Sequence, residues 1–222
     1  MNTRRIPLFP LNVVLFPGMP LPLHIFEPRY QQMIRHCLEG DRQFGVCLIR
    51  SGEEVGGPAD PYSIGSLCEI VNVTEIEGGR VNLLGIGRER FRVRRLFHSQ
   101  PYLEGEVELF ADDPSGQLET LAADVQAAAT RFIERILALT GKPTRELEFP
   151  GNPIDLSFVI AGLVQGPVED HQELLETRDT EFRLRRELEV LDRQYSQLPE
   201  APPPRTQVAV RFRATDDRIH LN

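Results

Sequence analysis

The sequence predicts an α+β protein with a β-rich first half and a helical second half. Between residues 6 and 30 the apolar residues come in short runs separated by six prolines. These prolines exclude a helix, because each one fixes φ and removes a backbone donor. After Asp112-Asp113-Pro114 the apolar residues instead recur every three or four positions, which is the period of a helix. We therefore expect a β-rich part at 1–111, a helical bundle at 112–198 and a proline-rich tail at 199–222.

One helix is expected among the strands of the first part. Residues 28–38 begin with a proline at the first helical position and are followed by Gly40, which is how helices commonly start and end. Residues 43–49 are expected to form a buried strand, and the glycine- and proline-rich residues 51–62 a surface loop that is either functional or mobile. Further strands are predicted at 67–76, 81–86, 88–97 and 102–110, with Gly78-Gly79 as a hairpin turn.

The second part is predicted to be a bundle of four helices joined by short connections. A long amphipathic helix covers residues 118–139. Asn152-Pro153 caps a short apolar helix at 155–164. Gly166-Pro167 opens a third helix, and Asp179 caps a fourth.

The tail is expected to leave the bundle in an extended conformation. Residues 199–204 contain four prolines, which makes this exit stiff. Residues 208–214 alternate as a strand does, and such a strand would dock on an open sheet edge or pair with another chain.

Charge and composition favour protein or peptide partners in the cytoplasm. The formal net charge is −8, and residues 111–222, with 13 basic and 20 acidic groups, carry −7 of it. An acidic half repels nucleic acid and anionic lipid. The sequence has no run of about 18 apolar residues, so no membrane span is predicted. Three cysteines, Cys37, Cys47 and Cys68, are an odd number without CxxC spacing, which argues against a disulfide framework or a zinc site and favours a reducing compartment.

Two stretches carry a resemblance to a known family. PLFPLNVVLFPGMPLPL at residues 7–23 resembles the opening of the N-terminal, substrate-recognition domain of the ATP-dependent protease Lon. HIFEPRY at 24–30 resembles the stand-alone, RING-fused and cereblon-like relatives of this domain more than the protease itself. DLSFVIAGLV at 155–164 and the following helical segment at 172–191 resemble the helical half of the same domain. The matching residues of that segment are Leu174, Leu175, Glu176, Asp179, Arg183 and Leu184.

The resemblance implies a fold and a function. The implied fold is a PUA-like β pseudobarrel followed by a helical bundle. The implied function is non-catalytic recognition of unfolded or specific protein and peptide clients, as an adaptor or regulator of proteolysis that works with Lon or another protease. A homodimer is compatible with the sequence.

No catalytic, metal or cofactor site is expected. The phosphate-binding motif GxxxxGK[ST] of an ATPase is absent. Lys142 is the only lysine, and no motif places a nucleophilic serine beside it, as a serine-lysine peptidase requires. The five histidines are dispersed, without the i, i+4 spacing of a helical metal pair. Gly85-x-Gly87 lacks the third glycine of a dinucleotide site and is better explained by a bulge or a tight strand crossing.

The proline-interrupted opening is the predicted peptide-binding region. It offers apolar side chains beside strand edges with unpaired backbone groups, which is what binding of an extended peptide requires. Large apolar residues are individually more often core than contact, so the prediction is a region. Its candidate residues are Met19, His24, Phe26 and Tyr30.

Two alternative functions remain open. Arg88, Arg90, Arg92 and Arg94 alternate along one predicted strand, and such a basic face would track the phosphates of RNA. The competing interpretation pairs these arginines with Glu104, Glu106 and Glu108 on the next strand. A small-molecule pocket, as in cereblon-like relatives, would need an aromatic cage, and the chain has no tryptophan to build it.

Overall fold

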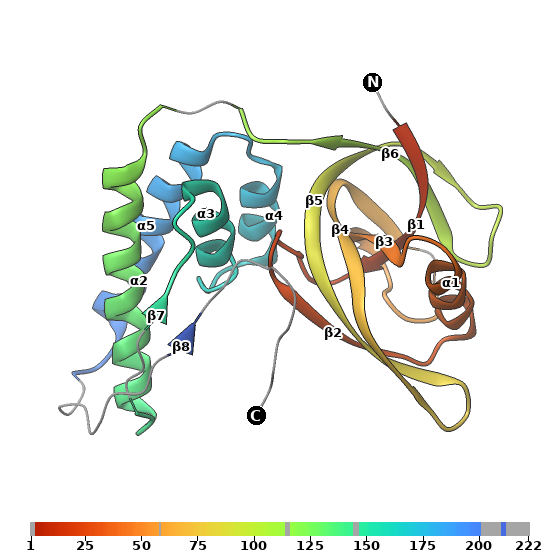
Figure 1. Ribbon diagram of the computed structural model, residues 1–222, viewed down its shortest axis with the longest axis horizontal. Helices are drawn as coiled ribbons and strands as arrows, with labels where there is room; N and C mark the ends of the chain where they lie inside the picture. The colour runs from red at the N-terminus through yellow and green to blue at the C-terminus, as the bar shows by residue number, and fades with distance from the viewer. Residues whose placement is uncertain (1–2, 58, 114–115, 144–146, 201–209, 212–222) are drawn as a thin grey trace. The chain divides into compact units, whose positions relative to one another are not determined.

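A computed structural model describes residues 3–57, 59–113, 116–143, 147–200 and 210–211 (Figure 1). It confirms the α+β class, with one six-stranded sheet and five helices among these residues. The chain divides into two compact units. We call residues 1–111 with 166–178 the strand unit, and 112–165 with 179–222 the helical unit.

The sheet of the strand unit closes on itself. Its strand order is β2 (Pro20–Ile25), β5 (Arg80–Phe97), β4 (Ala59–Ile76), β3 (Gln43–Gly52), β1 (Thr3–Leu11) and β6 (Leu103–Phe110). Because β6 also pairs with β5, these two strands, β4, β3 and β1 form a closed ring, and β2 is added to β5 outside it. The pairing of β1 with β3 is parallel, and the other pairings are antiparallel.

Two hydrophobic cores lie on opposite faces of these strands. Neighbouring residues of a strand point to opposite faces, and in β1 Leu8 belongs to one core and Phe9 to the other. The Leu8 core gathers around Phe91, and it needs glycine at Gly45, where an added Cβ would lie 2.6 Å from both side chains. The Phe9 core is covered by α1 (Pro28–Glu39), which confirms the predicted helix and its apolar face.

The glycines predicted to form turns or crossings do so. Gly78 and Gly79 have φ values of 81° and 72° at the tip of the β4–β5 hairpin, which extends beyond the ring (Figure 1). At Gly87 an added Cβ would lie 2.2 Å from the carbonyl oxygen of Phe16. The connection from β1 to β2 therefore crosses β5 where no side chain fits, which confirms the tight crossing expected from Gly85-x-Gly87.

Helix α4 (Val168–Glu176) belongs to the strand unit, although its sequence lies between helices of the other unit. Gln172 Nε2 donates to the carbonyl oxygen of Ile64 at 3.1 Å. Arg90 Nη1 donates to the carbonyl oxygens of Leu175 at 2.7 Å and Thr177 at 2.6 Å. The buried guanidinium of Arg90 thus satisfies carbonyl oxygens that the end of a helix leaves unpaired. The helical unit therefore excludes residues 166–178, whereas the predicted helical part covered 112–198 without a break.

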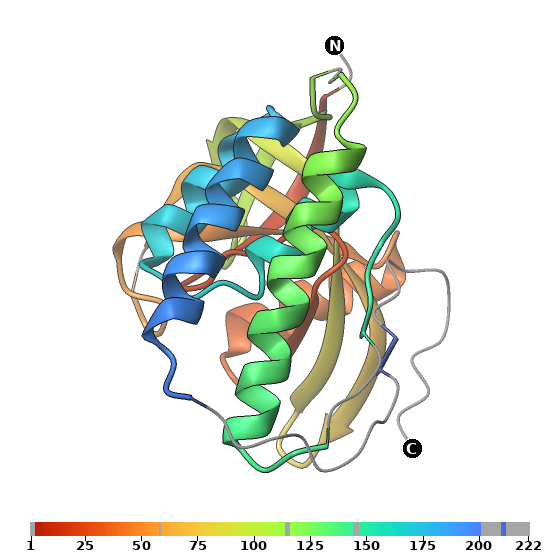
Figure 2. The same cartoon turned by 90° about the vertical axis from the view of Figure 1, so that its left-hand side faces the viewer.

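The helical unit packs α2 (Glu119–Leu139) against α5 (Thr180–Gln197), with α3 (Pro153–Ala161) beside them (Figure 2). The predicted caps are confirmed, because Asn152 accepts from the backbone N–H of Ile154 at 2.9 Å and Asp179 from that of Phe182 at 3.0 Å. No helix in the described part of the chain combines the length and the apolar composition that crossing a bilayer requires.

A buried ion pair fixes the start of the helical unit. Arg183 of α5 is fully buried and pairs with Asp112, whose side chain is 2% exposed. Its Nε donates to Ser157 Oγ at 3.0 Å, and its guanidinium lies 4.4 Å from the ring centre of Phe158. Glu187, one turn further along α5, is also buried, and neither of its carboxylate oxygens has a hydrogen-bond partner among the described residues.

Part of the predicted tail strand is seen. β8 (Val210–Arg211) pairs in parallel with β7 (Leu147–Glu148) of the same unit. The rest of the predicted strand at 208–214 lies outside the described residues.

Candidate functional site

The four candidate residues of the opening separate into two pairs. His24 and Phe26 lie on the exposed face of β2 and the residue after it, with ring centres 6.1 Å apart, and Phe26 is 49% exposed. His24 Nδ1 is 2.7 Å from Asn82 Oδ1 on β5. Tyr30 is only 5% exposed and stacks on Phe9 with ring centres 4.0 Å apart, and burial raises its pKa. Met19 is half-buried against the same core. The structure therefore brings only His24 and Phe26 together on the surface.

The outer edge of β2 is poorly suited to the addition of a strand. Pro20 and Pro22 sit opposite Ile86 and Leu84 of β5 without a register shift. Proline has no backbone N–H to donate to a neighbouring strand. Pro20 and Pro22 therefore occupy the positions of β2 whose backbone groups point away from β5. The free edge therefore presents carbonyl oxygens but lacks N–H donors at positions 20 and 22. At these two positions the expected open backbone groups are acceptors only.

Glu27, Arg29 and Glu54 form a group of hydrogen bonds, which we call the clasp, at the loop between β3 and β4. β3 continues to Gly52 and β4 begins at Ala59, so this loop is shorter than the predicted 51–62. Arg29 Nη2 is 3.0 Å from Glu27 Oε2, and Arg29 Nη1 donates to the carbonyl oxygen of Gly57 at 3.0 Å. Glu27 Oε2 in turn accepts from the N–H of Gly56, which has a φ of 79°. The helix start at 27–29 thus fastens a turn distant in sequence.

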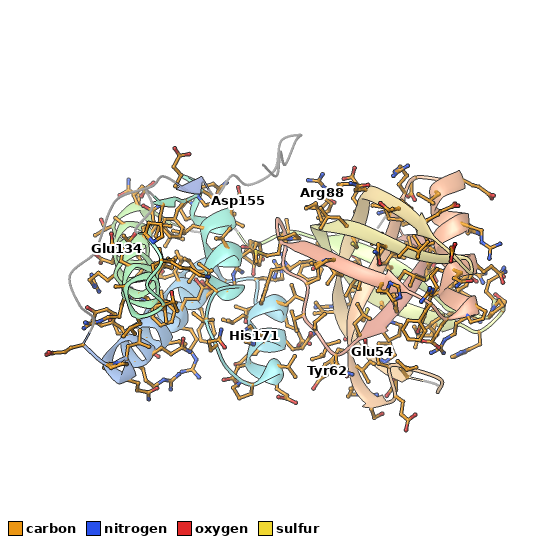
Figure 3. All side chains as sticks on the ribbon, turned by 90° about the horizontal axis from the view of Figure 1, so that it is seen from below. Glu54, Tyr62, Arg88, Glu134, Asp155 and His171 are labelled. Carbon is orange, nitrogen blue, oxygen red and sulfur yellow. The ribbon has the colours of Figure 1, made fainter. Side chains whose placement is uncertain are left out.

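The same clasp reaches the connection after β1. Glu54 projects from the loop of the strand unit (Figure 3), and its Oε2 accepts from the N–H of Asn12 at 2.9 Å. Its carbonyl oxygen accepts a longer bond of 3.4 Å from Arg29 Nη2. Three chain segments around residues 12, 27 and 54 are therefore linked by hydrogen bonds.

Each of these three segments carries an exposed apolar side chain next to its clasp residue. Val13 is 44% exposed, Phe26 49% and Val55 52%. Val13 follows Asn12, Phe26 precedes Glu27 and Val55 follows Glu54. We call these three side chains, with Glu27, Arg29 and Glu54, the Phe26 surface. Exposed apolar side chains on segments that fixed polar groups link to one another are candidates for an interaction site.

Sequence reasoning missed Glu27, Arg29 and Glu54. In the sequence Glu27 precedes the predicted helix at 28–38 and Glu54 lies in the predicted loop at 51–62, and neither position by itself indicates a contact. The available signal was the conjunction of Glu27 and Arg29 around a helix-starting proline, since two opposite charges at that position are free to hold a neighbouring loop.

The four arginines of the predicted nucleic-acid face do not share one exposed face. Arg90 is only 3% exposed, and its guanidinium holds the end of α4. Arg88 Nε is 2.6 Å from Glu69 Oε2, and Arg94 Nε is 2.7 Å from Glu108 Oε2. A register shift between Val93 and Arg95 also interrupts the expected alternation.

The glutamates of β6 are only partly used as expected. The structure shows the predicted pair between Arg94 of β5 and Glu108. Glu104 instead lies 2.5 Å from Arg5 Nη2, and Glu106 accepts from the hydroxyl of Thr3 at 3.0 Å. These glutamates therefore join β6 to β1 as well as to β5.

The cysteines have the properties of core residues. Cys37, Cys47 and Cys68 are buried, and burial raises the pKa of each thiol to about 12. Thiols with such pKa values carry no thiolate near neutral pH and are poor nucleophiles. Within the described ranges, no three His, Cys, Asp or Glu side chains gather as metal ligands would.

Sequence comparison relates most of the chain to one family. The profile described as the ATP-dependent protease La (LON) substrate-binding domain matches residues 5–193. Lon protease 2 of Myxococcus xanthus is 33% identical over 193 residues, which is 85% of this chain and 23% of that protein. Lon protease of Anaeromyxobacter dehalogenans is 31% identical over the same length and the same shares. The chain thus spans about a quarter of the length of these relatives.

Structural comparison points to the same domain. A Lon N-terminal domain protein from Xanthomonas campestris has a TM-score of 0.60 and 25% identity, with 88% of this chain and 99% of that chain covered. The N-terminal domain of a Mycobacterium avium complex Lon protease has a TM-score of 0.65 and 17% identity, over 85% of this chain and 98% of that chain. The second match supports the fold alone.

Proposed function

Since this chain belongs to the family of LON substrate-binding domains, we propose that it recognises polypeptide clients and catalyses no reaction itself. The observation that carries the proposal is the family match over residues 5–193. The match is to the substrate-binding domain, and the chain contains no GxxxxGK[ST] motif.

The Phe26 surface is the proposed contact site. Its apolar side chains are between 44% and 52% exposed in Val13, Phe26 and Val55. An apolar residue of a client that covers them removes apolar surface from water, which stabilises the complex. The clasp formed by Glu27, Arg29 and Glu54 fixes the segments that carry them. A site ordered before binding loses less conformational entropy when the client arrives.

In this proposal the chain acts as an adaptor or regulator of proteolysis in the cytoplasm. The relatives that support this role are full-length Lon proteases, in which the matched region makes up 23% of the protein. The client would be an unfolded or locally exposed segment, delivered to Lon or to another protease. We also propose a PUA-like architecture for the strand unit, which the closed ring of β1, β3, β4, β5 and β6 supports.

Binding of an unfolded protein tests the proposal. Fluorescein-labelled β-casein, which is natively unfolded, is titrated with the full chain and followed by fluorescence anisotropy. We expect saturable binding that weakens about tenfold in the double variant Phe26→Ser/Val55→Ser, because two apolar contacts are lost. Val71→Ser is the matched control, since Val71 is 44% exposed in the same unit and lies on β4, outside the Phe26 surface.

Two results would overturn the proposal. Absence of casein binding by the folded chain contradicts client recognition. Equal weakening by Val71→Ser and by Phe26→Ser/Val55→Ser contradicts the assignment to the Phe26 surface. Circular dichroism of each variant verifies that the fold is retained.

A further inference from the structure

We infer that the Phe26 surface selects client segments in which an aromatic or apolar residue stands beside lysine or arginine. The inference rests on the proposed function and names the class of segment that this site accepts. It follows from the charges that surround the exposed apolar side chains and from the hydrogen-bonding capacity of the neighbouring strand edge.

The charges at the surface are unbalanced. Three carboxylates, those of Glu27, Glu53 and Glu54, lie around one guanidinium, that of Arg29, which gives a local formal charge of 1 − 3 = −2. Glu53 belongs to this group because a Cβ added at Gly57 would lie 3.6 Å from Glu53 Oε2, and the Gly57 carbonyl oxygen accepts from Arg29.

The basic residue at the start of the same loop does not offset this charge. Arg50 forms an ion pair with Asp60 across the base of the loop, so the pair is neutral as a whole. A positive group on a client therefore meets a surface with net negative charge, whereas a carboxylate is repelled.

The carboxylates are already oriented to accept further donors. Glu54 accepts from the N–H of Asn12, and Glu27 accepts from Gly56 and Arg29. A carboxylate has about four acceptor positions. These bonds hold the oxygens of Glu27 and Glu54 in place, and acceptor positions remain for an ammonium or guanidinium group, including those of the exposed Glu53.

The edge of β2 favours the same kind of client. At positions 20 and 22 it offers carbonyl oxygens and no N–H groups, so a regular strand pairs with it incompletely. Side chains of lysine and arginine are donors without acceptors, and they match the carbonyl oxygens at positions 20 and 22. Recognition therefore depends on the client's side chains more than on its backbone.

Three peptides of equal length test the inference. They share a fluorescein label and a central Phe-Leu-Phe, and differ only in flanking residues, which are Lys, Gln or Glu on both sides. At 50 mM salt we expect the Lys peptide to bind at least fivefold more tightly than the Glu peptide, with the Gln peptide between them. At 500 mM salt the difference should shrink, because exposed charges are screened.

Variants connect the preference to named residues. Glu53→Gln/Glu54→Gln keeps an oxygen acceptor at each position and removes two charges, so we expect it to reduce the difference between the Lys and Glu peptides to less than twofold. Glu39→Gln/Glu89→Gln removes two exposed charges elsewhere on the strand unit and should leave the difference unchanged.

The outcomes separate the inference from the proposed function. Equal binding of the Lys and Glu peptides, or a preference that survives in Glu53→Gln/Glu54→Gln, overturns the inference and leaves client recognition standing. Failure of the chain to bind any of the three peptides and β-casein overturns the proposed function itself.

Discussion

Replacing Arg29 by alanine should release the loop between β3 and β4 and lower the stability of the strand unit. The side chain pairs with Glu27 through Nη2 at 3.0 Å and Nε at 3.1 Å, and its Nη1 donates to the carbonyl oxygen of Gly57 at 3.0 Å. It is 24% exposed. A charge-assisted bond of this kind contributes about 1–2 kcal/mol after solvent competition. The 3.4 Å bond to Glu54 adds little. We expect a loss of about 2 kcal/mol, or about 6–10 °C in Tm for a unit of this size.

Thermal unfolding and hydrogen exchange measure this change. The N–H of Gly56 donates to Glu27, which loses its partner in Arg29→Ala, so exchange of this amide should become about tenfold faster. Arg35→Ala is the control, because Arg35 is exposed on the same helix and its Nε donates to the carbonyl oxygen of Gln31 on that helix at 3.3 Å. Unchanged exchange at Gly56 together with a Tm within 2 °C of the parent chain would refute the role of the clasp.

Three further predictions concern the packing within each unit. Gly87→Ala should cost about 2 kcal/mol or more, since its Cβ would lie 2.2 Å from the backbone oxygen of Phe16, and urea unfolding measures the loss. Arg183→Met should cost about 3–5 kcal/mol in the same assay, because it removes the guanidinium charge that compensates the buried carboxylate of Asp112. Burial raises the pKa of Glu187, so the folded chain binds the proton of this carboxyl more tightly than the unfolded chain does. Proton binding therefore stabilises the fold fully below the unfolded pKa of about 4.3, and this stabilisation is lost as pH rises through the folded pKa. Glu187→Gln should therefore lose less unfolding free energy than the parent chain between pH 5 and pH 8.

Matched variants guard these predictions against general effects of substitution. Gly116→Ala should be neutral, because an added Cβ would have nothing within 4 Å. Arg185→Ala, on the same helix as Arg183 but exposed, should cost less than about 1 kcal/mol. A Gly87→Ala loss no larger than that of Gly116→Ala, or an equal cost at positions 183 and 185, contradicts the packing described. A Glu187→Gln variant whose pH dependence equals that of the parent chain contradicts a raised pKa.

Local signals in the sequence predicted local structure well. Asn152 and Asp179 cap their helices because a short polar side chain satisfies a backbone N–H two or three residues away. Gly78-Gly79 forms the hairpin turn because glycine accepts positive φ at both positions. In each case the cause and its effect lie within a few residues, so no knowledge of the fold is needed.

Features that depend on distant parts of the chain were not predictable. The burial of Arg90 depends on carbonyl oxygens at residues 175 and 177, about 85 positions away in sequence. The same contact draws α4 into the strand unit. The register shift after Val93 changes which arginines face outward, and strict alternation cannot anticipate such a shift. Of the candidate residues of the opening, His24 and Phe26 lie on the surface, whereas Tyr30 is buried in the core.

The most direct test of the account is a hydrogen-exchange footprint of the full chain with and without excess unfolded β-casein. Binding at the Phe26 surface predicts slower exchange in residues 12–16, 24–31 and 52–57, and little change in residues 88–97. No protection anywhere, or protection confined to 88–97, would contradict the account and direct attention to the arginine-bearing strand.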